Sequence, residues 1–375
     1  MSVLRSRPVL RWLVPATAAV AVIGGGAAIG TFAAEAEPSL PPRTAAQLLV
    51  DLQTSRLEGL SGTVVQRADL GLPPIAGLLP GNELTTLLTG THTLRVWYSG
   101  PDQQRVALLD TLGEQDLIRN GRDLWSWQSR TNTATHRTLG EDAGAGTAAP
   151  EAAPSLPATP QQAADLALGA IDPSTEVSVG RSATVAGQDA YELVLQPRDR
   201  DSLVHQLRIA IDAKRHVPLR FEVLAKGSDQ PAFEVAFTQV DYRRPDADQF
   251  TFNPPPGVTV TEEKAERPTG EPGHLEPAAD PQVRAVGDGW TTVLVARLDG
   301  AVGGKPAATK PATPPAGAAP GMDLSKLLGG LPTVSGEWGS GRLLTGKLFS
   351  VLLTDDGRVL AGAVTPERLY QAARG

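Results

Sequence analysis

The feature that most constrains the fold is a long series of short segments in which apolar and polar residues alternate. Alternation with a period of two is typical of β-strands that bury one face. Turn residues such as Gly100-Pro101-Asp102 and Asn120-Gly121 separate the segments at short intervals, which indicates an antiparallel meander. The expected strands are residues 61–68, 91–99, 104–110, 114–120, 123–129, 133–139, 175–185, 189–197, 202–212, 217–225 and 232–242.

The alternation also divides each expected strand into an apolar and a charged face. Arg208 falls between Leu207 and Ile209, and Glu222 follows Phe221, so charged and apolar side chains point in opposite directions. A sheet built this way has one apolar face that another element must cover.

Helix signals are few for so much sheet. Thr44 is the expected cap of a helix with an apolar stripe over residues 45–52, and Thr159 is the expected cap of a second helix over 160–171. We therefore expect a mainly β (α+β) fold, a curled and unclosed antiparallel β-barrel of about eleven strands with a few lid helices. Such a barrel often holds an apolar ligand, but the same pattern fits a filled core without a cavity.

Composition excludes several classes of function. The net charge of −7 argues against a nucleic-acid partner, which would require a basic surface. Because the chain has no cysteine, it has no disulfide, no thiol nucleophile, no thiolate metal site and no site for lipoprotein modification. The sequence contains no H-E-x-x-H, G-x-S-x-G or Walker A motif. We expect a protein that is not an enzyme and that uses no cofactor or metal.

An apolar segment near the N-terminus predicts export. Three arginines precede residues 12–34, which carry no charge and consist mostly of Ala, Val, Gly, Ile and Leu. This order sends the following chain across the membrane. The segment is long enough to span a bilayer, while Ala34-Glu35-Ala36 fits a signal-peptidase site. Residues 1–36 are therefore a cleaved signal peptide or a plasma-membrane anchor, and either one places the remaining chain outside the cytoplasm, secreted or anchored at the outer face.

The remaining chain divides into a main domain and an extension. Residues 37–262 contain the strand series, and residues 263–288 form a charged linker with several prolines. Residues 289–375 carry further strand signals, which we expect to complete the same sheet. Within this extension, residues 300–321 are rich in Gly, Ala, Pro and Thr and are expected to be a disordered linker.

Four segments, in this order, resemble the LolA/RseB superfamily of outer-membrane lipoprotein carrier-like proteins. They are THTLRVWYSGPDQQRVALLD (91–110), DLIRNGRDLWSWQSRTNTATH (116–136), IAIDAKRHVPLRFEV (209–223) and FEVAFTQVDYRRPDADQFTFNPPPGVTV (233–260). The segment GRLLTGKLFSVLLTDDGRVLAGAVTPERLY (341–370) is similar to the tail of actinobacterial members.

This resemblance implies an unclosed barrel whose apolar cavity binds acyl chains, with residues 160–171 as a lid helix. It implies a binder or carrier of acyl chains, lipids or lipoproteins. The alternative is a membrane-tethered regulatory module that binds a partner protein such as an anti-sigma factor. Trp125 and Trp127 could form a platform on which a ligand stacks, or they could pack in the core. The candidate ligand-binding residues are those on the expected inward faces: Leu94, Val96, Trp125, Trp127, Leu207, Ile209, Leu219, Phe221 and Val223.

Overall fold

The computed structural model describes residues 38–72, 89–110, 113–140, 159–169, 171–263, 284–297 and 330–375. The expected membrane segment 12–34 and the expected linker 300–321 lie outside these residues. In the part of the chain that is described, no helix is long and apolar enough to cross a membrane.

A large sheet contains the strands of the N-terminal two thirds of the chain. It comprises β1 (Leu60–Asp69), β2 (Thr89–Tyr98), β3 (Gln103–Asp110), β4 (Gly113–Asn120), β5 (Asp123–Gln128), β6 (Thr133–Thr138), β7 (Thr175–Val179), β8 (Ala183–Val185), β9 (Gln188–Pro197), β10 (Val204–Asp212), β11 (Pro218–Ala225), β12 (Pro231–Asp241) and β13 (Thr259–Glu263).

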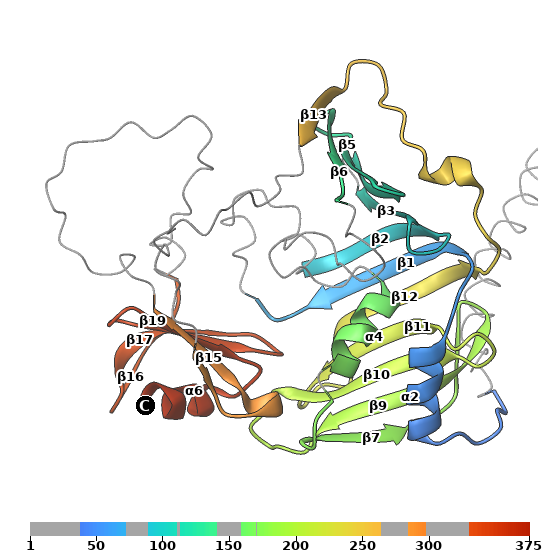
Figure 1. Cartoon of the computed structure of the whole chain (residues 1–375). Coiled ribbons are helices and arrows are strands. Elements are labelled where there is room, and N and C mark those ends of the chain that lie inside the picture. The colour runs from blue at the N-terminus through green and yellow to red at the C-terminus, as the bar shows by residue number, and fades with distance from the viewer. Residues whose placement is uncertain are drawn as a thin grey trace, which may run out of the picture. The chain divides into compact units, whose positions relative to one another are not determined.

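The order of the strands leaves the large sheet open. It runs β13-β6-β5-β4-β3-β2-β1-β12-β11-β10-β9-β7, with β8 also paired to β9, so β13 and β7 lie at opposite ends (Figure 1). Neighbouring strands are antiparallel except β13, which pairs with β6 in parallel. The predicted fold, a curled and unclosed antiparallel sheet with few helices, is confirmed, with 13 strands rather than about eleven.

Two helices lie against one face of the large sheet, which we call the helix face. The helix α2 (Ala45–Thr54) contacts β7 and β9, and α4 (Pro160–Gly169) contacts β11 and β12 (Figure 1). Both predicted caps are present. Thr44 and Gln47 form a reciprocal capping box on α2, and the Thr159 hydroxyl accepts a hydrogen bond from the Gln162 amide at 3.2 Å on α4.

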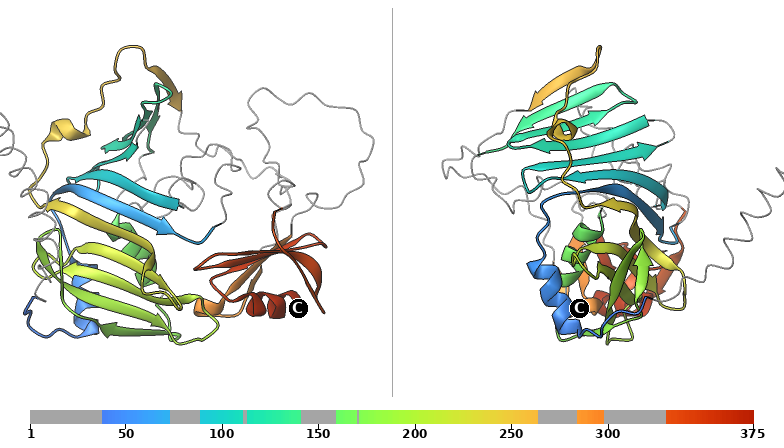
Figure 2. Two further views of the ribbon diagram at one scale, coloured as in Figure 1. Left: turned by 180° about the vertical axis from the view of Figure 1, so that it is seen from behind. Right: turned by 90° about the vertical axis from the view of Figure 1, so that its right-hand side faces the viewer.

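A strap crosses the other face of the sheet, which we call the opposite face. The strap is the chain between β12 and β13, and it includes the short 3-10 helix η2 (Ala247–Phe250). This helix lies across β3 and β4 (Figure 2). Asn132 fixes the end of the strap, because its side-chain amide donates to the Gly257 carbonyl at 2.7 Å and its carbonyl accepts from the Thr259 amide at 3.0 Å.

The C-terminal strands form a sheet of their own. Its order is β14 (Arg284–Val286), β15 (Val293–Arg297), β19 (Arg358–Gly362), β18 (Ser350–Thr354), β17 (Gly339–Thr345) and β16 (Thr333–Gly336). The 3-10 helix η3 (Gly289–Thr291) precedes β15, and α6 (Pro366–Ala373) follows β19 and contacts β18 and β19.

Two expectations for the extension are therefore wrong. Residues 289–375 do not complete the large sheet, because β15 to β19 pair only with one another and with β14 in the described part of the chain. The C-terminal sheet has its own buried cluster, with Leu352, Leu360 and Leu369 fully buried between this sheet and α6. A single isolated bridge between Ser202 and Val364 joins the two sheets in the described part of the chain. The expected linker 263–288 also ends in a strand, because β14 lies within it.

Candidate functional site

The helix face gathers seven of the nine predicted ligand-binding residues. Residues that pair across antiparallel strands share a face of the sheet, so the register shows which side chains lie together. Leu94 pairs with Val64, and Ile209 pairs with Phe221, which in turn pairs with Val235. The seven residues on this face are Leu94, Val96, Leu207, Ile209, Leu219, Phe221 and Val223.

The two helices close the central part of this face. Ile209 and Leu219 have no exposed surface, and Phe221 is 5% exposed. They belong to one core with Leu48 of α2 and Ala164 of α4. In this arrangement the candidate residues are packed as a core, and a ligand must displace a helix to reach them.

Further residues of the helix face were missed in the sequence. The strand β12 contributes Phe233, Val235 and Phe237, and β9 contributes Leu193 and Leu195, all of them buried. The alternation in AFEVAFTQV was visible and could have identified the three residues of β12. The ring centroids of Phe221 and Phe233 lie 6.4 Å apart in an edge-on arrangement, so β11 and β12 present a joint aromatic surface.

Trp125 and Trp127 share a face, as their spacing requires, but it is the opposite face. Trp125 pairs with Ile118 and Trp127 with Asp116, whereas the helix face of β4 carries Leu117. Both indole rings contact Phe252 of the strap, at centroid distances of 5.1 and 6.0 Å. Their expected place on the inward apolar face is therefore wrong, and they pack in a small second core under the strap.

This second core contains a buried ion pair. Arg105 donates a hydrogen bond to Asp116, whose side chain is 1% exposed. Asp116 Oδ1 has no hydrogen-bond partner among the described residues, and neither has the nearby Trp127 Nε1. Burial raises the pKa of Asp116 to about 6 even though Arg105 opposes the shift. Arg105 also donates to the Gln249 carbonyl at 3.4 Å and lies 5.0 Å from the centroid of Trp97, so the pair ties the strap to the sheet.

His136 forms a second polar cluster at the β13 edge. Its Nε2 lies 2.9 Å from Asp123 Oδ1, its Nδ1 lies 2.8 Å from Glu262 Oε2, and its ring stacks on Trp125 at 4.2 Å. Carboxylates only accept hydrogen bonds, so both contacts together require a doubly protonated imidazolium. Burial lowers the pKa of His136, but the two carboxylates outweigh this effect and raise the pKa above its ordinary value. No group of His, Asp or Glu in the described ranges could hold a metal ion.

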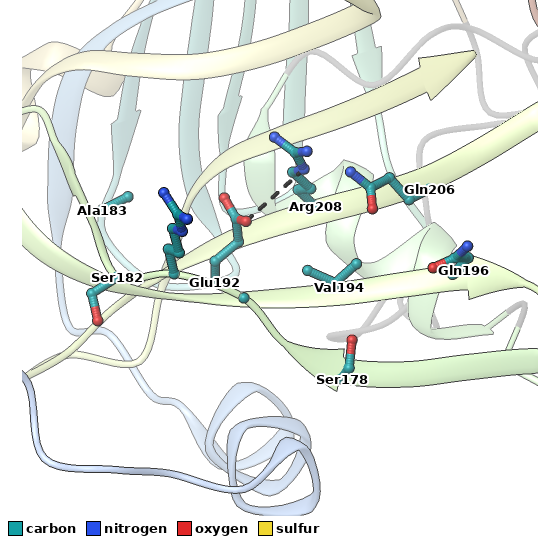
Figure 3. Close-up of a pocket in the computed structure, with 10 residues that line it drawn as sticks. Ser178, Ser182, Ala183, Glu192, Val194, Gln196, Gln206 and Arg208 are labelled. Carbon is teal, nitrogen blue, oxygen red and sulfur yellow. Dashed lines mark ion pairs between the residues drawn. The ribbon is translucent and has the colours of Figure 1, made fainter. Parts of the chain in front are cut away.

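A polar pocket of about 550 Å³ opens on the opposite face, over β7, β9 and β10 (Figure 3). Sequence reasoning missed it, because its residues lie on separate strand segments within residues 178–208 and only the pairing of these strands brings them together. Arg208 Nε lies 3.9 Å from Glu192 Oε1 across the pocket. The lining residues are Ser178, Gly180, Arg181, Ser182, Ala183, Glu192, Val194, Gln196, Gln206 and Arg208.

Comparison with known proteins returns solved structures only. No protein-family model matches the sequence, and no curated protein matches it. The chain is similar to MucB in the MucA/MucB complex from Pseudomonas aeruginosa, with 17% identity over 88% of this chain and 96% of that chain and a TM-score of 0.43. It is similar to an uncharacterized conserved protein from Thermus thermophilus, with 12% identity over 58% of this chain and 99% of that chain and a TM-score of 0.34. It is also similar to a LolA superfamily protein from Nitrosomonas europaea, with 13% identity over 56% of this chain and 99% of that chain and a TM-score of 0.21.

Proposed function

We propose that this protein is a non-catalytic, extracytoplasmic binder or carrier of acyl chains, lipids or lipoproteins, with the helix face as the binding surface and α4 as the movable lid. The observation that carries the proposal is the continuous apolar surface of β1, β2 and β9 to β12, of which two ten-residue helices cover the part over β9, β11 and β12. The seven candidate residues of this face would contact the ligand.

The described lid contacts of α4 are made by four residues. Pro160, Ala163 and Ala164 are buried and Leu168 is partly buried, so about nine described side-chain carbons are withdrawn from water. At about 0.8 kcal/mol per carbon, exposing them costs roughly 7 kcal/mol. Transfer of a long acyl chain out of water yields roughly 10 kcal/mol or more. The gain from burying the ligand therefore exceeds the cost of moving these described contacts.

Lipid content and lipid uptake test the proposal. We expect native mass spectrometry of the full-length protein, purified without detergent, to show co-purified lipid, and we expect the protein to take up a fluorescent fatty acid. An engineered disulfide between Ala164→Cys on α4 and a cysteine on the facing part of β11 should block uptake until reductant is added. Because the chain has no cysteine of its own, the single Ala164→Cys variant is a clean control. Absence of both bound lipid and uptake would refute the proposal.

The second candidate is a membrane-tethered regulatory module that binds a partner protein such as an anti-sigma factor. The open ends of the large sheet support it, because all residues of the edge strand β13 are exposed and edge strands can pair with another chain. MucB, one of the similar structures, was solved together with MucA. Pull-down of a membrane anti-sigma factor by full-length protein that carries no lipid would favour this second function.

A further inference from the structure

A bulge at the edge of the large sheet shapes the polar pocket. Val179 of β7 pairs with Leu193, and Ala183 of β8 pairs with Ala190, so residues 180–182 face only two residues of β9. Bulges of this kind redirect side chains and often lie beside functional sites. A Cβ on Gly180 would lie 2.7 Å from Glu192 Oε1, so glycine at this position lets the backbone approach the carboxylate.

The charges around the pocket do not balance. Glu192 accepts a hydrogen bond from Arg220 at 3.3 Å and lies 3.9 Å from Arg208, while Arg220 also lies 3.4 Å from Glu222. In one orientation of its amide, Gln206 also accepts hydrogen bonds from Arg208 at 2.5 and 2.7 Å. The remaining cation, Arg181, has no hydrogen-bond or ion-pair partner among the described residues and lines the pocket. An acidic chain thus carries a local excess of positive charge here.

We propose that this pocket binds a phosphate-type oxyanion, held by the guanidinium groups of Arg181 and Arg208 with Gln196 and Ser178 as further donors. Guanidinium groups present planar forks of N–H donors that match phosphate oxygens. The hydroxyl and amide groups supply neutral hydrogen-bond donors to the same volume. Glu192 holds Arg208 in place, and Arg220 also pairs with Glu222, so the excess positive charge at the pocket is that of Arg181.

The shape of the site favours a compact anion over an acidic protein segment. Arg181 lies on the bulge and Arg208 on β10, so the two arginines come from either side of β9 and line the same pocket (Figure 3). The anion has two chemical sources, free phosphate or the phosphate of a lipid headgroup, and the same donors would bind both.

Calorimetric titration of the full-length protein in nonionic detergent with inorganic phosphate, at pH 7 and constant ionic strength, tests the site. Arg181 is exposed, so the Arg181→Gln variant should fold normally, and we expect it to bind phosphate roughly tenfold or more weakly. Arg297→Gln is the matched control, because Arg297 is an exposed arginine on β15 of the other sheet, and it should bind like the wild type. Arg208→Lys, which keeps the charge but loses the fork, should give an intermediate affinity.

Vesicles distinguish the two sources of phosphate. Arg181-dependent binding to phosphatidylglycerol vesicles over phosphatidylcholine vesicles would identify a lipid headgroup, and binding of inorganic phosphate alone would identify the free ion. Absence of saturable phosphate binding, or equal affinity in wild type and Arg181→Gln, overturns the proposal. Arg181-dependent binding of polyglutamate without phosphate binding also overturns it, in favour of an acidic protein partner.

Discussion

The edge strand β13 should be released from the sheet as the pH rises. The contacts of His136 with Asp123 and Glu262, at 2.9 and 2.8 Å, join β5, β6 and β13 through an imidazolium. Because the pKa of His136 in the folded protein is raised above 6.5, the folded state binds the proton more tightly than the unfolded state. The stabilisation is complete below about pH 6.5 and is lost as the pH rises through the raised pKa.

The expected size of this effect is small and local. The partner carboxylates are 54% and 67% exposed, so solvent screens them and each contact contributes about 0.5 kcal/mol. Only the Glu262 contact reaches β13, because Asp123 lies on β5, so about 0.5 kcal/mol changes the opening equilibrium of β13 roughly twofold. The pair between Arg137 and Glu263 and the parallel ladder to β6 remain, so the rest of the sheet should not respond.

Amide hydrogen exchange at pH 5.5 and 8.5, corrected for intrinsic rates, measures this effect. We expect protection of residues 259–263 to fall roughly twofold at the higher pH. His136→Gln should remove the difference between the two pH values. His205→Gln is the matched control, because His205 is exposed on β10, and it should preserve the difference. Equal protection at both pH values, or the same pH dependence in His136→Gln, would refute the reasoning.

Two further substitutions test the two cores of the large sheet. Leu219→Ala should lower the free energy of unfolding by about 2–5 kcal/mol, measured by urea unfolding, and should reduce fatty-acid uptake. Leu360→Ala, the control at an equally buried leucine of the C-terminal sheet, should lower the free energy of unfolding by a similar amount and leave uptake unchanged. The Asp116 carboxyl binds its proton more tightly in the folded than in the unfolded state, so its contribution reduces stability as pH rises from about 4 to about 6. The difference in unfolding free energy between wild type and Asp116→Asn should therefore change over this interval, and a constant difference would contradict the burial that we assign to Asp116.

Most of what could be predicted from the sequence followed from the alternation of apolar and polar residues with a period of two. Leu207 and Arg208 lie on opposite faces because successive side chains of a strand must alternate, whatever the strand pairs with. The helix caps at Thr44 and Thr159 could also be predicted, because a cap depends only on a few neighbouring residues.

Pairing between distant segments was not visible in the sequence. The alternation of DLWSWQ places Trp125 and Trp127 together but does not say which face of the sheet is covered by helices. Their face was decided by the strap, which brings Phe252 over the indole rings. In the same way, the strand signals of residues 341–364 showed that strands form, but their pairing into a separate sheet depends on the buried cluster with α6.

Alternation along β10 also explains how one strand can serve two sites without coupling them. Ile209 enters the core under the helices, while its neighbour Arg208 lines the polar pocket on the opposite face. The two side chains point away from each other through a single layer of backbone, so a substitution at one leaves the packing of the other unchanged. An acyl chain on the helix face and an oxyanion on the opposite face would therefore bind independently, and phosphate should not alter fatty-acid uptake. A dependence of one on the other would mean that the sheet itself changes curvature on binding, because no side chain of β10 can reach both faces.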